Sequence, residues 1–153
     1  ATVLEPEIEA GEPARVRLTL QPHLGEQVTR VIEVPIDAQL AGKDVRIQLQ
    51  PGYTVERVVP APETFADLVR VLPKLRYAPE TLIASYDLPD EASAAFEGQV
   101  ARRLPQGAAD TLRPTSSSVA PALYSAQSQT VIPLKGVIVG QDTVTVHVRE
   151  VVR

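Results

Sequence analysis

The residue types that could do chemistry in this chain are serine, histidine and carboxylate, because there is no cysteine. Ser116, Ser117 and Ser118 follow a proline and could supply the nucleophile of a serine hydrolase, with His23 or His147 as its base. No Gly-x-Ser-x-Gly elbow surrounds these serines. A serine-rich segment after a proline is more often a solvated loop or a helix cap, and we favour that interpretation.

Metal ligation would need histidine and carboxylate side chains in a cluster. His23 falls in turn material, and His147 falls on the expected outer face of the last strand. Carboxylates recur at short spacing at Glu5, Glu7 and Glu9, and again at Asp87, Asp90 and Glu91. Neither group has the glycine and the terminal glutamate of an EF-hand calcium loop. We therefore expect exposed acidic surface there, with no metal and no cofactor.

The charge and the aromatic content restrict the partner. The net charge is −4 at pH 7, and the lysines and arginines are scattered, so the chain offers no basic field to nucleic acid. Four tyrosines and two phenylalanines are too few and too separated for a base-stacking platform. No apolar run approaches the roughly 20 residues of a membrane span. The sequence thus predicts neither a nucleic-acid partner nor membrane insertion.

The elements that would position these residues are mostly strands. In residues 14–20, Val16, Leu18 and Leu20 face one side while the residues between them are polar, which predicts a half-buried strand. Alternation of the same kind recurs at 27–36, 45–49, 82–88, 130–134, 137–139 and 143–149, and more weakly at 54–59. Such alternation is typical of antiparallel sheets with one solvated face.

One segment, about 62–72, has the period of a helix instead. Its apolar residues Phe65, Leu68, Val69 and Leu72 are spaced i, i+3, i+4 and i+7 and form one stripe. Thr64 can cap the first turn, with Asp67 three residues on, and Pro73 should end the helix near Leu72. Burial of this stripe would stabilise the fold only if a sheet received it.

The second half of the chain is less regular. Residues 89–129 predict a long irregular excursion with one or two short helical turns, and we expect it to be the most mobile surface. Residues 137–148 predict a rigid closing hairpin. If this hairpin lies at a sheet edge, its polar face is a candidate partner-contact surface that another strand could pair with. That face carries Thr143, Thr145, His147 and Arg149.

Several segments are distinctive when taken together. They are AGEPARVRLTLQP at 10–22, GE at 25–26, VPI at 34–36, TFADLV at 64–69 and PTSSSV at 114–119. The set resembles the non-catalytic C-terminal region of large exported bacterial proteins that carry a SpoIVB-type (S55) serine peptidase-like domain upstream. In that family the peptidase residues lie in the N-terminal domain, and none can be placed on this chain. The resemblance implies an accessory module that is exported to the cell envelope or the extracellular space.

We predict an α+β, mainly β fold: an antiparallel Ig-like β-sandwich with one inserted amphipathic helix. A single β-rich domain over 1–153 is favoured, and the alternative is a sandwich of 1–60 and 130–153 with 61–129 as an inserted α/β lobe. The predicted function is a non-catalytic binding or structural module that contacts protein, either the rest of the parent chain or another cell-envelope protein. A serine peptidase-like hydrolase and a cell-wall or carbohydrate-binding module are the alternatives.

Overall fold

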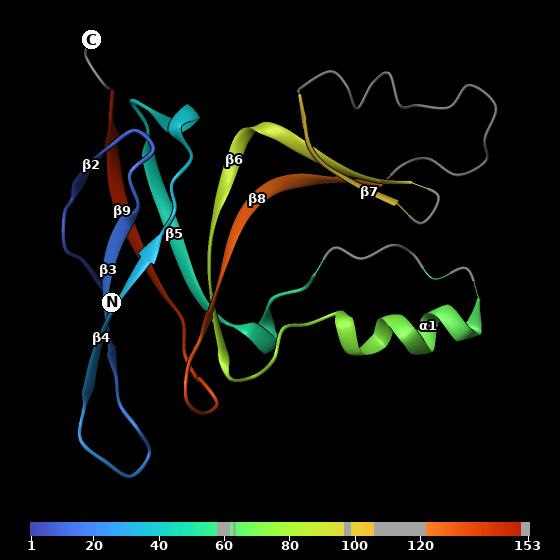
Figure 1. Cartoon of the computed structure of the whole chain (residues 1–153), viewed down its shortest axis with the longest axis horizontal. Coiled ribbons are helices and arrows are strands. Elements are labelled where there is room, and N and C mark those ends of the chain that lie inside the picture. Colours follow the sequence, from blue (N-terminus) through green and yellow to red (C-terminus); the bar gives the residue numbers. More distant parts are fainter. Residues whose placement is uncertain (58–61, 63, 97–98, 106–121, 151–153) are drawn as a thin grey trace.

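The computed structural model of the chain describes residues 1–57, 62, 64–96, 99–105 and 122–150. Two sheets face one another at one end of the molecule, and an arm made from the far halves of two long strands extends away from them (Figure 1). A short helix lies on the side of this arm, away from the part of the molecule where the two sheets pack (Figure 1).

The smaller sheet has three strands in the order β1-β3-β4. They are β1 (Thr2–Val3), β3 (Ala14–Leu20) and β4 (Val28–Val34), and both pairings are antiparallel. Along β3, Ala14, Val16 and Leu18 are buried while the residues between them are exposed, so the predicted strand and its faces are confirmed. The same alternation begins in β4 only at Ile32, because Val28 lies beyond the part that the other sheet covers and is half exposed.

The larger sheet has the order β2-β9-β5-β6-β7, with β8 paired to β6. Its strands are β2 (Glu7–Glu9), β5 (Asp44–Pro51), β6 (Thr81–Phe96), β7 (Gln99–Pro105), β8 (Ala122–Pro133) and β9 (Asp142–Arg149). Only β2 and β9 run parallel; the other pairs are antiparallel.

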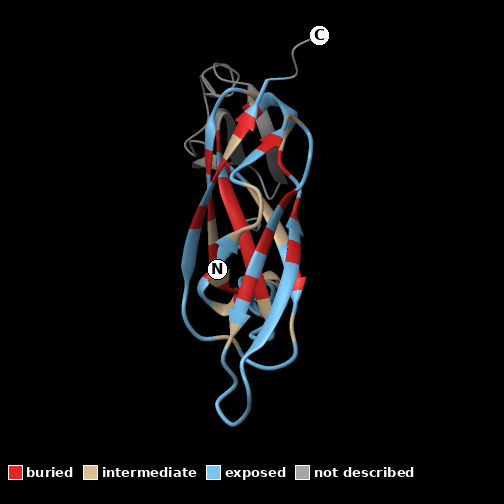
Figure 2. Ribbon diagram, turned by 90° about the vertical axis from the view of Figure 1, so that its left-hand side faces the viewer, coloured by how far each residue is buried: buried red, intermediate tan, exposed pale blue. Residues whose placement is uncertain are grey.

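The core lies between the two sheets, where buried residues alternate with exposed ones along the strands (Figure 2). Val16 and Val34 of the smaller sheet belong to the same apolar cluster as Ile47, Val146 and Val148 of the larger one. Tyr86 ties the connection after β4 to the larger sheet: its hydroxyl donates to the carbonyl of Pro35 and accepts from the N–H of Asp37. The fold is therefore a β-sandwich-like α+β arrangement.

The prediction of an irregular excursion at 89–129 is wrong for the described part of that range. β6 continues as strand to Phe96, β7 follows, and β8 begins at Ala122. Alanine, serine and aspartate have low strand propensity, so this sequence resembles a loop when considered alone. Pairing with β8, which lies far along the chain, imposes the strand. Residues 106–121 of the expected excursion lie outside the described residues.

The expected closing hairpin is also wrong. β8 pairs with β6, whereas β9 lies between β5 and β2, so the last two strands are not partners. Val137 and Val139 are exposed and outside any strand, between Gly136 and Gly140, which both have positive φ. In the described part of the weak strand expected at 54–59, only Glu56 forms a bridge, an isolated one to Arg76 outside the strands.

The helix forms where the period predicts it. α1 (Phe65–Val71) begins after Thr64, whose hydroxyl accepts a hydrogen bond from the N–H of Asp67 at 3.1 Å. It ends in a 3-10 turn, η3 (Leu72–Lys74), that contains Pro73, so the predicted end is confirmed. Two further turns, η1 (Ala38–Leu40) and η2 (Gly52–Thr54), lead into and out of β5.

Candidate functional site

Three surfaces of the described chain could contact a partner. The first, the β9 face, is the predicted surface and consists of Thr143, Thr145, His147 and Arg149. The second, the α1 stripe, consists of Phe65, Leu68, Val69 and Leu72. The third, the β5 edge, is the main chain of residues 44–47 on the side that faces β6.

The structure brings the residues of the β9 face together on one side of β9. However, β9 is not a free edge strand, so another strand could not pair along its full length. β5 pairs with β9 on one side, and β2 pairs with it on the other side from His147 to Arg149. The side chains of Thr143 and Thr145 are exposed, and that of His147 is half-buried. The β9 face can therefore offer side chains to a partner, while strand pairing at its C-terminal end is already occupied.

The charged residues of the β9 face have partners on the neighbouring strands. The Nδ1 atom of His147 lies 2.7 Å from the carboxylate of Asp44, and the Arg149 guanidinium lies 3.9 Å from the carboxylates of Glu7 and Glu9. These pairs are exposed, and exposed ion pairs typically contribute about 0–1 kcal/mol. They mainly fix side-chain positions and leave little unpaired charge on this face.

The first residue of β9 carries the one pKa shift resolved in the described chain. Asp142 accepts a hydrogen bond from the N-terminal ammonium of Ala1 and another from the N–H of Thr143. The ammonium bond first, and the main-chain bond second, lower the pKa of Asp142 below its ordinary value against a small opposing effect of burial. This pair lies at the end of the strand and organises no chemistry.

The α1 stripe is exposed, and no sheet receives it within the described residues. The side chain of Phe65 is 80% exposed, and those of Val69 and Leu72 are each 54% exposed. No residue of α1 is buried, and the helix lies on the side of the arm, away from the part of the molecule where the two sheets pack (Figure 1). The amphipathic pattern therefore has no covering partner within the described residues.

The β5 edge exists because β6 diverges from β5 after Ser85. β5 has eight residues and pairs with β9 from Asp44 to Leu49. β6 has sixteen residues, but it pairs with β5 only between Gln48 and Pro51, and from Glu91 onwards it pairs with β7. Residues 44–47 of β5 consequently have a strand on one side only within the described chain.

The direction of the main chain decides which groups this edge presents. The carbonyl of Lys43 accepts from the N–H of Val148, so this carbonyl faces β9. Because main-chain groups alternate along an antiparallel strand, those of Asp44 and Arg46 face the gap beside β6. The edge therefore presents two N–H and two C=O groups in the alternation that an added strand requires.

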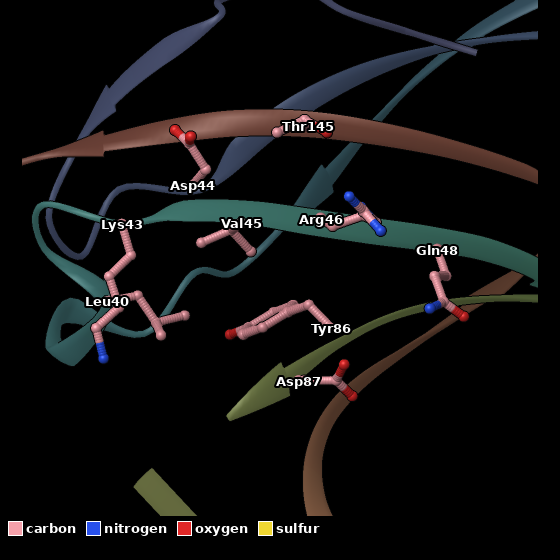
Figure 3. Close-up of a pocket in the computed structure, with 9 residues that line it drawn as sticks. All are labelled: Leu40, Lys43, Asp44, Val45, Arg46, Gln48, Tyr86, Asp87 and Thr145. Carbon is pink, nitrogen blue, oxygen red and sulfur yellow. The ribbon is translucent and has the colours of Figure 1, made fainter. Parts of the chain in front are cut away.

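A pocket of about 450 Å³ lies against this edge (Figure 3). Its apolar wall is formed by Leu40, Val45 and Tyr86, and the Tyr86 ring lies between β5 and β6. Its polar lining is contributed by Lys43, Asp44, Arg46, Gln48, Asp87 and Thr145. The volume falls within the range of about 300–1,000 Å³ that is typical of small-molecule pockets.

The charges around the pocket are not equally engaged. Asp44 contacts His147, and Asp87 accepts from the side-chain amide of Gln127 at 2.8 Å. Arg46 is exposed and has no hydrogen-bond or ion-pair partner among the described residues. Its neighbour on β9 is Thr145, which is uncharged. Arg46 is therefore a cation at the mouth of the pocket that is available to a ligand.

Sequence reasoning missed the β5 edge, because an edge depends on which strands pair. Val45 and Ile47 alternate with polar residues as in any two-sided strand, and nothing local shows that β6 leaves β5 after Ser85. Strand length gives no signal either, because a strand of sixteen residues is long enough to pair all eight residues of β5.

The remaining candidates lie apart from this pocket. Ser116, Ser117 and Ser118 lie outside the described residues, and His23 is exposed in the connection between β3 and β4. Within the described ranges, no three histidine, aspartate or glutamate side chains come together in a way that could hold a metal ion. None of the helices described is long and apolar enough to cross a membrane.

The chain was compared with protein-family models, with curated protein sequences and with solved structures, and none of the three comparisons found a match.

Proposed function

We propose that this chain is a non-catalytic protein-binding module of a larger exported bacterial protein, built on an Ig-like β-sandwich. The observation that carries the binding role is the β5 edge, where main-chain groups of Asp44 and Arg46 border a pocket. The partner is an extended segment of protein that adds a strand beside β5, either from the parent chain or from another cell-envelope protein.

Strand addition follows from the chemistry of a sheet edge. Unpaired N–H and C=O groups in a row are a template for another strand, and natural proteins usually block such edges with a covering element, a bulge, a proline or charged side chains. Asp44 and Arg46 are charged, so a partner strand must accommodate these charges. Residues 44–47 contain no proline, and a pocket rather than a covering element lies beside them. Main-chain hydrogen bonds would supply affinity, and the pocket would supply selectivity through alternate side chains of the partner.

Two further features support a role in contacting protein. The α1 stripe exposes large apolar side chains on one helix face, and contiguous exposed apolar surface commonly marks an interaction site. The packed, mostly antiparallel sheets are of the kind that Ig-like domains use to display edges and loops. The export and the parent protein rest on the sequence resemblance described above.

The test uses a capped heptapeptide that alternates threonine with valine, added to the isotope-labelled chain. Strand addition should shift the amide resonances of residues 44–47 more than those of the β9 face. Methylating the peptide nitrogens that face β5 should abolish binding, because each methyl group removes a donor, whereas methylating the alternate nitrogens should preserve it. Equal loss from both methylation patterns, or no shifts at 44–47, would contradict the proposal.

A pair of variants serves as the matched control. Arg46→Pro removes the N–H that faces the gap and leaves the pairing with β9 intact, so it should weaken binding of this uncharged peptide strongly. Arg46→Ala keeps that N–H and should bind the same peptide as well as the original chain does. A thermal melt of each variant confirms that the sandwich is folded before binding is compared.

A further inference from the structure

We infer that the β5 edge selects an extended peptide with the pattern acidic, apolar, basic, read from its N-terminus, docked antiparallel to β5. This inference rests on the proposed strand addition and specifies its partner. It follows from which side chains of β5 and β6 point into or beside the pocket (Figure 3).

The acidic residue is assigned by Arg46. A strand docked beside β5 places one residue directly opposite Arg46 on the exposed face, with Cβ atoms about 4.5–5.5 Å apart. Arg46 has no partner among the described residues, so a carboxylate there can form paired hydrogen bonds with its guanidinium without displacing an existing contact. A lysine in the same position would face an unpaired cation.

The basic residue is assigned by Asp44. Because the docked strand runs antiparallel, its residue opposite Asp44 lies two positions after the one opposite Arg46. Asp44 already contacts His147, and Asp87 and Lys43 also line the pocket, so a peptide carboxylate here would meet two like charges and one opposite charge. A lysine or arginine would reduce that repulsion, so the favoured peptide is not a run of acidic residues.

The residue between them points to the other face of the docked strand. It lies opposite Val45 and faces the wall of Leu40, Val45 and Tyr86, all of which are buried. A charged side chain there would lose its solvation without a partner. An apolar side chain of moderate size fits both the chemistry and the limited volume of the pocket.

The reversed order, basic then apolar then acidic, is a sharp control because it has the same composition and net charge. In the antiparallel docking it places a lysine opposite Arg46 and a carboxylate opposite Asp44. One opposite-charge pair across a sheet is worth about 0.2–1 kcal/mol relative to an uncharged pair. Two such pairs give an expected preference of about two- to thirtyfold for the acidic-first peptide over the neutral one, and a larger preference over the reversed one.

The experiment titrates the whole chain with three capped, dye-labelled heptapeptides that differ only at two positions: glutamate-valine-lysine, lysine-valine-glutamate and threonine-valine-threonine. Fluorescence anisotropy at low salt should rank them in the order acidic-first, neutral, basic-first. The charge reversal Arg46→Glu should reduce or invert that order, and raising the salt concentration should compress it. Arg17→Glu, which changes an exposed arginine of the other sheet, should leave the order unchanged.

The outcomes separate this inference from the proposed function. Equal affinity for all three peptides, with amide shifts at residues 44–47, would overturn the charge pattern and leave strand addition standing. No binding of any peptide would overturn both. A preference for the acidic-first peptide that persists in Arg46→Glu would show that Arg46 does not select the acidic residue, and would overturn the inference. Concentration-dependent dimerisation that blocks peptide binding would make a second copy of this chain the occupant and overturn the inference.

Discussion

β3 and α1 have the clearest periodic patterns in the sequence, and the structure treats them in opposite ways. In β3, Val16 and Leu18 are 0% and 4% exposed, because the larger sheet packs on their face. In α1, the side chains of Leu68 and Phe65 are 39% and 80% exposed. A pattern therefore predicts the local conformation in both cases, but burial requires a second surface that the pattern does not describe.

Because β3 is buried and α1 is exposed, the two regions contribute differently to the stability of the fold. Burying a large apolar side chain stabilises a fold by about 1.5–3 kcal/mol relative to leaving it exposed. β3 obtains that stabilisation within the sandwich, whereas α1 depends on its cap and its own hydrogen bonds within the described chain. The sandwich is therefore the structural part of the molecule, and the α1 stripe is surface that is available to a partner.

The largest expected effect is on the buried face of β3. Leu18→Asp places a charge among apolar side chains, where it would cost several kcal/mol against a total stability of about 5–15 kcal/mol. We expect this variant not to fold at room temperature. Arg17→Asp changes the neighbouring exposed position and should melt within a few degrees of the original chain. Equal melting temperatures for the two variants would show that the assignment of faces in β3 is wrong.

The comparison is sharpest when the same substitution is made in each region. Leu49 is 2% exposed in β5, and Leu72 is 54% exposed at the end of α1. Leu49→Ala should lower the free energy of unfolding by about 2–5 kcal/mol, because it leaves a cavity in the core. Leu72→Ala should change it by less than about 0.5 kcal/mol. Urea titrations would measure both, and a loss above about 2 kcal/mol for Leu72→Ala would mean that the α1 stripe is covered.

An intermediate and local effect is expected from the cap of α1. Thr64→Ala removes the hydroxyl that accepts from the N–H of Asp67, which typically costs a helix about 1 kcal/mol. Because no residue of α1 is buried, the loss should fray the helix without lowering the stability of the sandwich. Hydrogen exchange should therefore accelerate in residues 68–71 and stay unchanged in 144–148. Acceleration in both segments would show that the helix and the sandwich unfold together.

How far the sequence could predict this molecule depends on the range of the interactions involved. Alternation in β3, β5 and β9 predicted both the strands and the buried face, because period two and burial act residue by residue. In the first half of β6 it predicted the strand, but Ile83 and Ser85 on the other face are buried as well. The Thr64 cap and the stop at Pro73 were predictable for the same reason, since each involves only neighbours in the chain.

What the sequence could not predict is the set of strand partners. The second half of β6 became a strand through its pairing with β8, and β9 lies beside β5 and β2 rather than beside β8. Those choices depend on contacts between distant segments, and single-chain patterns do not contain them. The β5 edge is a product of the same choices, so the pocket and the role assigned to Arg46 emerged only from the structure.

The smallest expected effect on stability comes from removing an exposed contact within the sandwich. It tests whether the burial of a residue, rather than the region in which it lies, determines how much its substitution destabilises the fold. In the isolated 153-residue chain, the pKa of Asp142 is lowered in the folded state by the hydrogen bond from the Ala1 ammonium and then by that from the N–H of Thr143. A lowered folded pKa stabilises the fold above the ordinary carboxyl value of about 3.9, and this stabilisation is lost as the pH falls towards the folded pKa. Asp142→Asn should therefore melt slightly below the original chain at pH 7, with the gap closing below about pH 4. The gap should also shrink in high salt, because the pair is solvent-exposed. Scanning calorimetry at a series of pH values measures this directly, and a gap that widens as the pH falls would mean that the carboxylate is destabilising in the folded chain.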